Sequence, residues 1–317
     1  MSNASNDMGR AYEYAWINVL YNRLINFKKV NIIDNSSFLA NKKSWNLVSD
    51  EQKNLFKISA EAAVDLILEL EPIMIEISDD CITLEFQADS SGVSGDVRDI
   101  VIKRQDIAWE IGLSVKHNHE AIKHSRLANR LDFGNKWFGI PCSKNYWDNV
   151  QPIFKMLGKE KNKGTKWADI VNKDLIVYLP LLNAFIDEVK HAYSIDSQVP
   201  RKMVEYLIGT YDYYKVVSID SKKMTLVHSF NMHNTLNQPS SSKSSSIVVP
   251  TVELPTEIID LRIKPNSTNT VEMYLNNGWQ ISFRIHSAST DVEQSLKFDI
   301  QFMGMPISIL TIECKWQ

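Results

Sequence analysis

The order of hydrophobic and polar positions predicts helices at the start of the chain and strands directly after them. Apolar residues recur at three- and four-residue spacing over 9–27 and 59–70, which is typical of helices that bury one face. Ser49 or Asp50 predicts a turn before the second helix, and Pro72 predicts its end. The period then shortens to two. This alternation predicts a hairpin and two further strands, over 73–77, 82–87, 97–103 and 107–116.

The rest of the chain divides into a helical stretch and a strand-rich end. Helices are predicted over 120–131, 146–157, 167–193 with a break at Pro180, and 201–209. A hairpin is predicted next, over 213–219 and 224–230. The last strands are predicted over 257–264, 270–275, 279–286, 296–302 and 307–314, with a tight turn at Asn277-Gly278.

These elements predict an α/β (α+β) protein with a central mixed sheet flanked by helices. The Ser-rich stretch QPSSSKSSS is the low-complexity part of the sequence and is typical of a flexible linker. The predicted organisation is a disordered tail over 1–8, an α/β core over 9–236, a linker over 237–246 and a β-rich segment over 247–317.

The charges are unevenly distributed along the chain, which the net charge of −3 does not show. Residues 101–166 carry 13 basic and 6 acidic side chains, whereas residues 1–100 carry 9 basic and 16 acidic ones. A basic segment in an acidic protein can bind phosphates by releasing counterions, whatever the total charge. The sequence therefore allows a nucleic acid as partner, although for the lysines of 159–166 taken alone a solvated loop is the favoured interpretation.

Cysteine usage and hydropathy predict a cytoplasmic protein that does not enter a membrane. The three cysteines are widely spaced and form no C-x-x-C pair, so a disulfide framework is not expected. The N-terminal sequence has no apolar signal segment. No stretch approaches the ~20 apolar residues that a membrane span needs.

The segment SGDVRDIVI places two carboxylates at the entrance to an apolar strand. Asp99 directly precedes Ile100, Val101 and Ile102, and Asp96 lies three residues earlier. A buried strand that opens with an acid holds the carboxylate rigidly at the edge of the sheet. Carboxylate oxygens suit a hard divalent cation such as Mg²⁺.

The next predicted strand ends in Lys116. By strand alternation Glu110, Ser114 and Lys116 point to one face, together with Gly112. A lysine beside a metal-bound acid can orient or deprotonate water, or stabilise charge on a phosphate.

This arrangement resembles the PD-(D/E)XK nucleases, with two departures. Arg98 stands where proline is usual, and Ser114 stands where a second acid is expected. Glu110 is separated from Lys116 by about 20 Å of strand and cannot replace that acid directly. Glu13 on the first helix is the first candidate for the missing carboxylate and metal ligand, and Asp96 is the second.

A second literal match at the C-terminus is interpreted as an ordinary edge strand. Asp299 and Glu313-Cys314-Lys315 fit the spacing. However, the nuclease fold needs a helix and a strand after the lysine, and only two residues follow it.

The stretch KHNHEAIKHSR supports two interpretations. His117, His119 and His124 allow a zinc site, but no fourth ligand is evident. In the preferred interpretation the following helix presents a basic face that holds DNA phosphates. The residues assigned to that contact are His119, Lys123, His124, Arg126 and Arg130.

Seven long blocks make the chain resemble the HaeIII-type restriction endonucleases over nearly its whole length. They include GRAYEYA, GDVRDIVI, EIGLSVKHNHEAIKHSRL, DFGNKWFGIPCS and GWQISFRIHSAST. The resemblance implies a restriction-endonuclease-like fold and a type II enzyme that cuts double-stranded DNA at GGCC. It also implies a magnesium cofactor and a DNA methyltransferase in the same system.

A site of four G·C pairs calls for basic side chains that can satisfy the two acceptors of guanine in the major groove. The candidates outside the catalytic strands are Lys215, Arg284, His286 and Lys297. A palindromic site also suggests a homodimer. The alternative, kept open by Ser114, is a non-catalytic DNA-binding protein on a degenerate nuclease fold. An RNA-directed nuclease is less favoured, because no set of stacking aromatic residues is evident.

Overall fold

The computed structural model describes residues 2–88, 95–118 and 122–317, and the chain forms two compact units. The first unit consists of 1–120, 209–253 and 307–317, and the second consists of 121–208 and 254–306. Along the chain, the second unit is thus inserted twice into the first. Both the core predicted over 9–236 and the β-rich segment predicted over 247–317 contribute to each unit.

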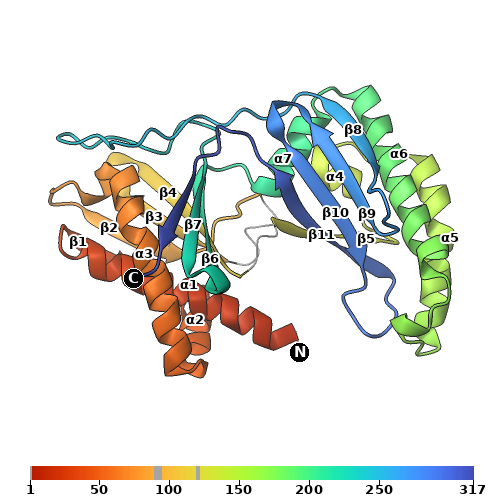
Figure 1. The fold of residues 1–317 in the computed structure, drawn as a ribbon, viewed down its shortest axis with the longest axis horizontal. Coiled ribbons are helices and arrows are strands. Elements are labelled where there is room, and N and C mark those ends of the chain that lie inside the picture. The colour runs from red at the N-terminus through yellow and green to blue at the C-terminus, as the bar shows by residue number, and fades with distance from the viewer. Residues whose placement is uncertain (1, 89–94, 119–121) are drawn as a thin grey trace. The chain divides into compact units, whose positions relative to one another are not determined.

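The first unit is built on a seven-stranded mixed sheet in the order β1-β2-β3-β4-β6-β7-β12 (Figure 1). Strand β4 runs antiparallel to β3 and parallel to β6. The strands are β1 Lys29–Ile32, β2 Cys81–Phe86, β3 Ile100–Arg104, β4 Trp109–His117, β6 Tyr213–Ile219, β7 Met224–Phe230 and β12 Thr311–Lys315. The helices are α1 Ser2–Leu24, α2 Ser36–Leu47 and α3 Asp50–Leu70.

Helices α1 and α3 cover one face of this sheet and form its core. Both helices pack on the central strands as well as on each other. Trp16 of α1, Ile67 of α3 and Leu113 of β4 are among the fully buried members of one hydrophobic cluster. Burial of this apolar surface is the main favourable contribution to the stability of the unit. It also fixes α1 against the strand that carries Lys116.

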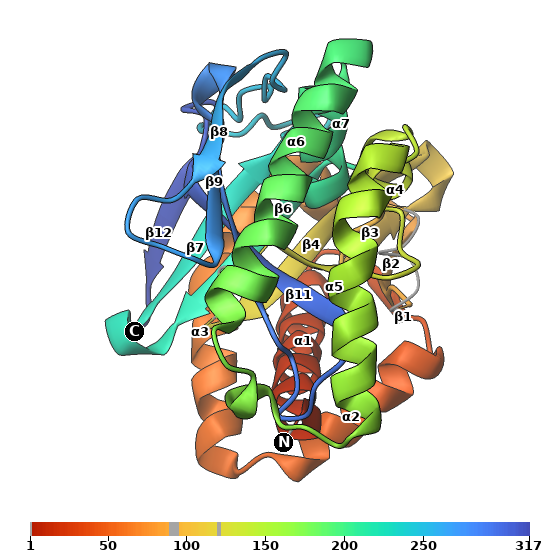
Figure 2. The same cartoon turned by 90° about the vertical axis from the view of Figure 1, so that its right-hand side faces the viewer.

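The second unit contains a five-stranded antiparallel sheet in the order β5-β11-β10-β9-β8. Its helices α5 and α6 run side by side (Figure 2). The strands are β5 Lys123–Ala128, β8 Ile258–Ile263, β9 Thr270–Leu275, β10 Gln280–His286 and β11 Ser295–Gly304. The helices are α4 Phe133–Phe138, α5 Lys144–Asn162, α6 Leu179–Ile195 and α7 Val199–Ile208, with a π-helical turn at Asp174–Tyr178.

Much of the predicted secondary structure is confirmed. The hairpin over 213–219 and 224–230 has the predicted bounds as β6 and β7. Helix α6 begins at Leu179 with Pro180 in its first turn, where the missing N–H costs nothing. Asn277 and Gly278 both have positive φ, as the predicted turn requires. Strand β12 is an edge strand, as predicted.

The predicted hairpin of 73–77 with 82–87 is wrong. Residues Pro72–Ile75 form a short 3₁₀ helix instead, and β2 pairs with β1 and β3. Pro72 fixes φ near the helical value and offers no N–H to a strand partner. The backbone carbonyl of Ile73 accepts a hydrogen bond from Arg104, which holds this turn on the end of β3. Strand β1 and helix α2 were not predicted.

The helix predicted over 120–131 is also wrong, because Lys123–Ala128 is strand β5. It pairs antiparallel with β11, so that Arg126 lies opposite Lys297. Ser125 and Leu127 are buried while Arg126 is exposed, which is the two-residue period of a strand. Lys123 and Arg126 therefore do not share the helical face that was predicted for them.

The predicted tail and linker are more ordered than the sequence suggested. Helix α1 begins at Ser2, within the tail predicted over 1–8. The Ser-rich segment has no helix or strand, but carboxylates of the first unit bind it. Glu71 accepts hydrogen bonds from the backbone N–H groups of Asn237 and Gln238, and Glu76 accepts one from Ser241. No helix in the described part of the chain is long and apolar enough to cross a membrane.

Candidate functional site

Asp99 and Lys116 meet where β3 begins and its neighbour β4 ends. Asp99 lies one residue before β3, and its backbone N–H donates to the carbonyl of Leu113 at 2.8 Å. In the β3–β4 register Ile100 is opposite Leu113, so Asp99 faces Ser114 and Lys116 on the same side of the sheet. The Lys116 Nζ lies 2.9 Å from Asp99 Oδ2. The sequence predicted this pairing, and the structure brings the two groups into direct contact.

The donors around Asp99 converge on one of its two oxygens. Oδ2 accepts hydrogen bonds from the Val115 backbone N–H at 2.6 Å, from Ser114 Oγ at 3.3 Å and from Lys116. No donor within the described ranges binds Oδ1. The carboxylate is therefore fixed in orientation while one oxygen remains open to a ligand, and its side chain is 21% exposed.

Glu13 is the second acid near Lys116. Burial alone would lower the pKa of Lys116, but the charges of Asp99 and Glu13 and the hydrogen bond to Asp99 outweigh it and raise the pKa. The Asn41 side-chain amide donates to Glu13 Oε2 at 2.8 Å, which orients this carboxylate. Asn41 lies on α2, a helix that was not predicted, so this contact was not expected from the sequence.

Asp96 and Glu110 are both bound to Arg98. Two nitrogens of Arg98 donate to the two oxygens of Asp96, and the third donates to Glu110 Oε1. Ser114 is buried and contributes the hydroxyl that contacts Asp99. Of the three acids considered for the second carboxylate, Glu13 is the one whose charge acts on Lys116.

The donor set suits a cation that keeps part of its shell as water. No group of three His, Cys, Asp or Glu side chains in the described segments is arranged to hold a metal ion. Mg²⁺ is commonly held by one or two carboxylates, with waters and substrate phosphate oxygens completing its shell. Asp99, with its open Oδ1, and Glu13 provide such a pair.

No group that could hold a metal ion is found around the histidines of the alternative zinc interpretation within the described residues. His117 Nε2 contacts Asp220 Oδ2 at 2.9 Å, and its ring packs on Tyr12 and Phe56. His119 lies outside the described residues, and His124 is on β5 of the second unit, where its side chain is not described. His117 is thus a partner of Asp220 at the end of β4.

The C-terminal match to the nuclease pattern is divided between two sheets. Asp299 lies on β11 of the five-stranded sheet, whereas Glu313 and Lys315 lie on β12 of the seven-stranded sheet. The interpretation of 307–314 as an edge strand holds.

Four of the predicted DNA-contacting residues share one face of the five-stranded sheet. Arg126 is opposite Lys297, which is opposite His286, and Arg284 is opposite Asp299 on the same strands. The alternating positions of these strands are buried. Arg126, Arg284, His286 and Lys297 are named the basic sheet face below.

Contacts within the basic sheet face order its side chains. Arg126 donates to Ser295 Oγ at 3.0 Å, and Arg284 lies 3.2 Å from Asp299 Oδ2. Burial lowers the pKa of Lys297, and Asp299 and Arg126 shift it in opposite directions, with the net effect downward. The basic sheet face is thus electropositive, and Asp299 partly offsets its positive charge.

The other predicted DNA contacts are placed differently. Arg130 is exposed just after β5, and the side chain of Lys123 is not described. Lys215 is 7% exposed in β6, in register with Ser114 of β4 and His228 of β7. Burial, followed by the charge of Lys215, lowers the pKa of His228 to about 4. Lys215 is therefore buried on a central strand of the seven-stranded sheet, next to Ser114 of the Asp99–Lys116 site.

Comparison with known proteins places the chain in a family of nucleases. The chain matches the HaeIII restriction endonuclease family over residues 9–306, and it belongs to that family. It is 51% identical to the type II restriction enzyme HaeIII of Haemophilus aegyptius over 318 aligned positions, which cover 100% of both chains. No solved structure matches the chain.

Proposed function

We propose that this chain is a type II restriction endonuclease that hydrolyses double-stranded DNA at a short palindromic site, GGCC. The observation that carries the proposal is the contact of Asp99, just before β3, with Lys116, near the end of the paired strand β4, with Glu13 beside them. The GGCC site rests on the family resemblance and on the name of the relative. It does not follow from the geometry of the site.

The Asp99 carboxylate and Glu13 would hold Mg²⁺ between them. When bound there, the ion would neutralise phosphate charge and make water more acidic. Asp96 is a weaker candidate ligand, because both of its oxygens already accept hydrogen bonds from Arg98.

Lys116 acts as a cation in this proposal. Its raised pKa keeps the ammonium group charged at neutral pH, so it cannot remove a proton from water. It can donate a hydrogen bond to the scissile phosphate and stabilise the charge that develops there. Ser114 and the Val115 N–H keep Asp99 in place during this step.

The basic sheet face would contact the DNA. Arginine and lysine satisfy the O6 and N7 acceptors of guanine, and strands can enter the major groove. Arg284 is more than half exposed and is the first candidate for a base contact. Arg126 and Lys297 lie in the adjacent row and would contact phosphates.

The assembly and setting of the enzyme extend the same proposal. A palindromic target fits a homodimer with two-fold symmetry. A DNA methyltransferase of the same system would protect host DNA. A cytoplasmic location is expected from the free cysteines.

The proposal is tested by digesting plasmid DNA with the purified chain, with and without Mg²⁺. Discrete fragments that end within GGCC and require the metal are expected. The Asp99→Ala variant should give no fragments but still shift a GGCC duplex in a gel. A shift without cutting by the wild-type chain would instead support a non-catalytic DNA-binding protein.

A further inference from the structure

Arg98, the residue directly before Asp99, is held on three sides. It is 6% exposed. Its Nε and one terminal nitrogen donate to the two oxygens of Asp96 at 2.8 Å, and the other terminal nitrogen donates to Glu110 Oε1 at 2.8 Å. The guanidinium carbon lies 4.1 Å from the centre of the Tyr211 ring. This side chain has one orientation, fixed by two carboxylates and an aromatic surface.

Strand β4 is shaped to receive this arginine. A Cβ atom on Gly112 would lie 1.9 Å from Arg98 Cδ and 2.4 Å from its Cγ. The arginine therefore crosses β4 at Gly112, which has no side chain, on the face opposite the hydrophobic cluster that contains Ile111 and Leu113. Gly112 lies on the same face as Ser114 and Lys116, two and four residues further along the strand.

The turn that leads into Asp99 is fixed by the same contacts. The backbone N–H of Arg98 donates to Asp96 Oδ1 at 3.1 Å, and Gly95 accepts a hydrogen bond from Thr210 N–H. Gly209 has φ of +88°, and a Cβ there would lie 2.9 Å from the Gly95 carbonyl oxygen. The path of residues 95–98 is thus closely constrained by 209–211.

We propose that Arg98 is a positioning residue, which locks the turn before β3 onto β4 at Gly112 and so sets the orientation of the Asp99 carboxylate toward Lys116. The inference rests on the proposed function and explains why arginine replaces the usual proline at this position. Proline stiffens the turn through its own ring, whereas here a buried arginine ties the turn to the neighbouring strand.

A purely structural role is the competing explanation, since buried ion pairs can serve packing alone. Such pairs add little net stability, because removing their charges from water costs about as much as their attraction returns. Arg104 provides a matched control. It is 2% exposed, is the last residue of β3 and also pairs with two carboxylates, but it lies at the opposite end of β3 from Asp99.

The test compares Arg98→Lys with Arg104→Lys. Lysine keeps the charge but loses the planar fork that binds Asp96 through two bonds. Arg98→Lys should lower kcat for GGCC cleavage on the order of 10- to 100-fold, because small misplacements of reacting groups have effects of this size. The KM for DNA should stay within about twofold. Arg104→Lys should lower the midpoint of thermal unfolding and leave kcat of the folded enzyme unchanged.

A readout without metal or substrate gives an independent result. The backbone N–H of Val115 donates to Asp99 Oδ2 at 2.6 Å, so its NMR chemical shift reports the orientation of that carboxylate. This shift should change in Arg98→Lys and stay the same in Arg104→Lys. A fall in thermal stability with normal kcat and an unchanged Val115 shift in Arg98→Lys would overturn the proposal.

Two further variants keep the test decisive if Arg98→Lys does not fold. Glu110→Gln weakens one contact of Arg98 at a partly exposed position and should lower kcat by a smaller factor. Gly112→Ala should lower kcat in the wild type but should have no added effect in the Arg98→Ala variant. Additive effects of the two changes would contradict the inference. Failure of the wild-type chain to cut DNA would sink the proposed function itself, whereas normal cutting by the Arg98 variants sinks only this inference.

Discussion

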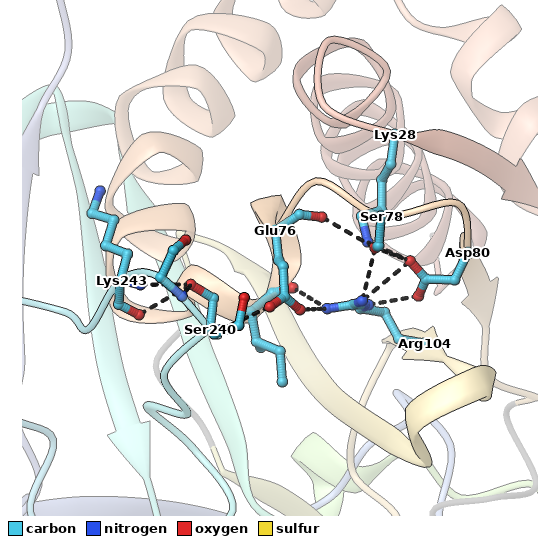
Figure 3. A network of polar contacts seen from close by, with 10 residues as sticks. Lys28, Glu76, Ser78, Asp80, Arg104, Ser240 and Lys243 are labelled. Atoms are coloured by element: carbon cyan, nitrogen blue, oxygen red, sulfur yellow. Dashed lines mark hydrogen bonds and ion pairs between the residues drawn. The ribbon is translucent and has the colours of Figure 1, made fainter.

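Two charged clusters of the first unit have similar composition but different structures. In each, a basic side chain lies close to two carboxylates: Lys116 with Asp99 and Glu13, and Arg104 with Asp80 and Glu76. The three nitrogens of Arg104 make five hydrogen bonds, and Lys28 and Ser78 complete the cluster (Figure 3). The Arg104 cluster is therefore closed, with its charges satisfied by protein groups.

The Lys116 cluster is open by comparison. The Lys116 side chain is 29% exposed, that of Lys28 is fully buried, and Asp99 has one oxygen that no described donor binds. A closed cluster fixes one conformation, because every group already has a partner. An open cluster retains charges to which a cation or a phosphate can still bind. The type of residue does not distinguish the two roles, but the completeness of the contacts does.

The largest effect is expected from Asp99→Asn. The amide keeps the shape of the side chain but cannot hold a cation as the carboxylate does. Cleavage in Mg²⁺ should fall at least about 10³-fold, or about 4 kcal/mol in the activation barrier. The unfolding midpoint should stay near that of the wild type, because the site is partly exposed. Single-turnover cleavage measures the loss of activity, and thermal unfolding measures stability. A fall in stability without loss of cleavage would show that the Asp99 cluster supports the fold, as the Arg104 cluster does.

Asp80→Asn should give the reverse result. It removes one charge from a buried pair and leaves Arg104 and Lys28 short of a counter-ion. The free energy of unfolding should fall by about 3 kcal/mol. Cleavage by the folded protein at low temperature should be unchanged. Urea unfolding measures the loss, and a variant as stable as the wild type would show that this cluster does not support the fold.

Lys116→Gln should lower kcat by about 10²-fold, as expected when one stabilising donor is lost from a charged transition state. Binding of the GGCC duplex in Ca²⁺ should change little. A pH–rate profile provides the check: with a charged lysine in the wild type, no ionisation of Lys116 should appear between pH 6 and 9. A base-type ionisation in that range that disappears in the variant would assign Lys116 to proton removal instead.

The pH dependence of stability should separate two glutamates that bind the Ser-rich segment. Burial raises the pKa of Glu71 to about 7, whereas hydrogen bonds from Ser241 and Arg104 lower that of Glu76 to about 2. The folded protein therefore holds a proton on Glu71 more tightly than the unfolded chain does, and this contribution is lost as pH rises from about 4.5 toward 7. The contribution of Glu76 is present above about 4.5 and lost as pH falls toward 2.

Glu71→Gln isolates the first of these effects. The stability difference between pH 5 and pH 8 should shrink in this variant, because its amide does not titrate. Glu69→Gln is the control, since Glu69 is exposed and accepts a hydrogen bond from Ser246 at the surface. Urea unfolding at the two pH values gives the comparison, and an unchanged difference in Glu71→Gln would exclude this titration.

The smallest effect is expected from Arg126→Ala on the basic sheet face. One lost phosphate contact should weaken DNA binding several-fold and equally for GGCC and unrelated duplexes. It should reduce the slope of log K against log salt by about 1. Arg284→Ala should instead weaken GGCC binding more than non-specific binding. Equal slopes for wild type and Arg126→Ala would place the DNA contact elsewhere.

Local patterns were enough to predict the pair at the centre of the site. Asp99 and Lys116 lie on neighbouring strands joined by a short turn, so their meeting follows from strand alternation and the antiparallel register. The β6–β7 hairpin was predicted for the same reason. Contacts between adjacent elements of regular structure require little information beyond the order of residues.

Contacts over longer separations were not predictable in this way. The pairing of β5 with β11 joins residues more than 160 positions apart. Because of this pairing, Lys123–Ala128 is a strand where a helix was predicted. The contact of Asn41 with Glu13 depends on a helix whose sequence has no clear apolar period. Tertiary packing overrides weak local preference in such segments.

The sequence by itself determined which groups could carry the chemistry, because a carboxylate before an apolar strand and a lysine at the end of the next are fixed by covalent order and alternation. Only the tertiary structure decided which further acid lies near Asp99 and Lys116, and which acids are instead paired with another residue. Glu13 comes from a helix packed on the sheet. Arg98 binds Asp96 and Glu110, and it can do so because Gly112 of β4 has no side chain in its path. Those choices depend on distances in space between residues far apart in the chain, which periodicity alone does not contain.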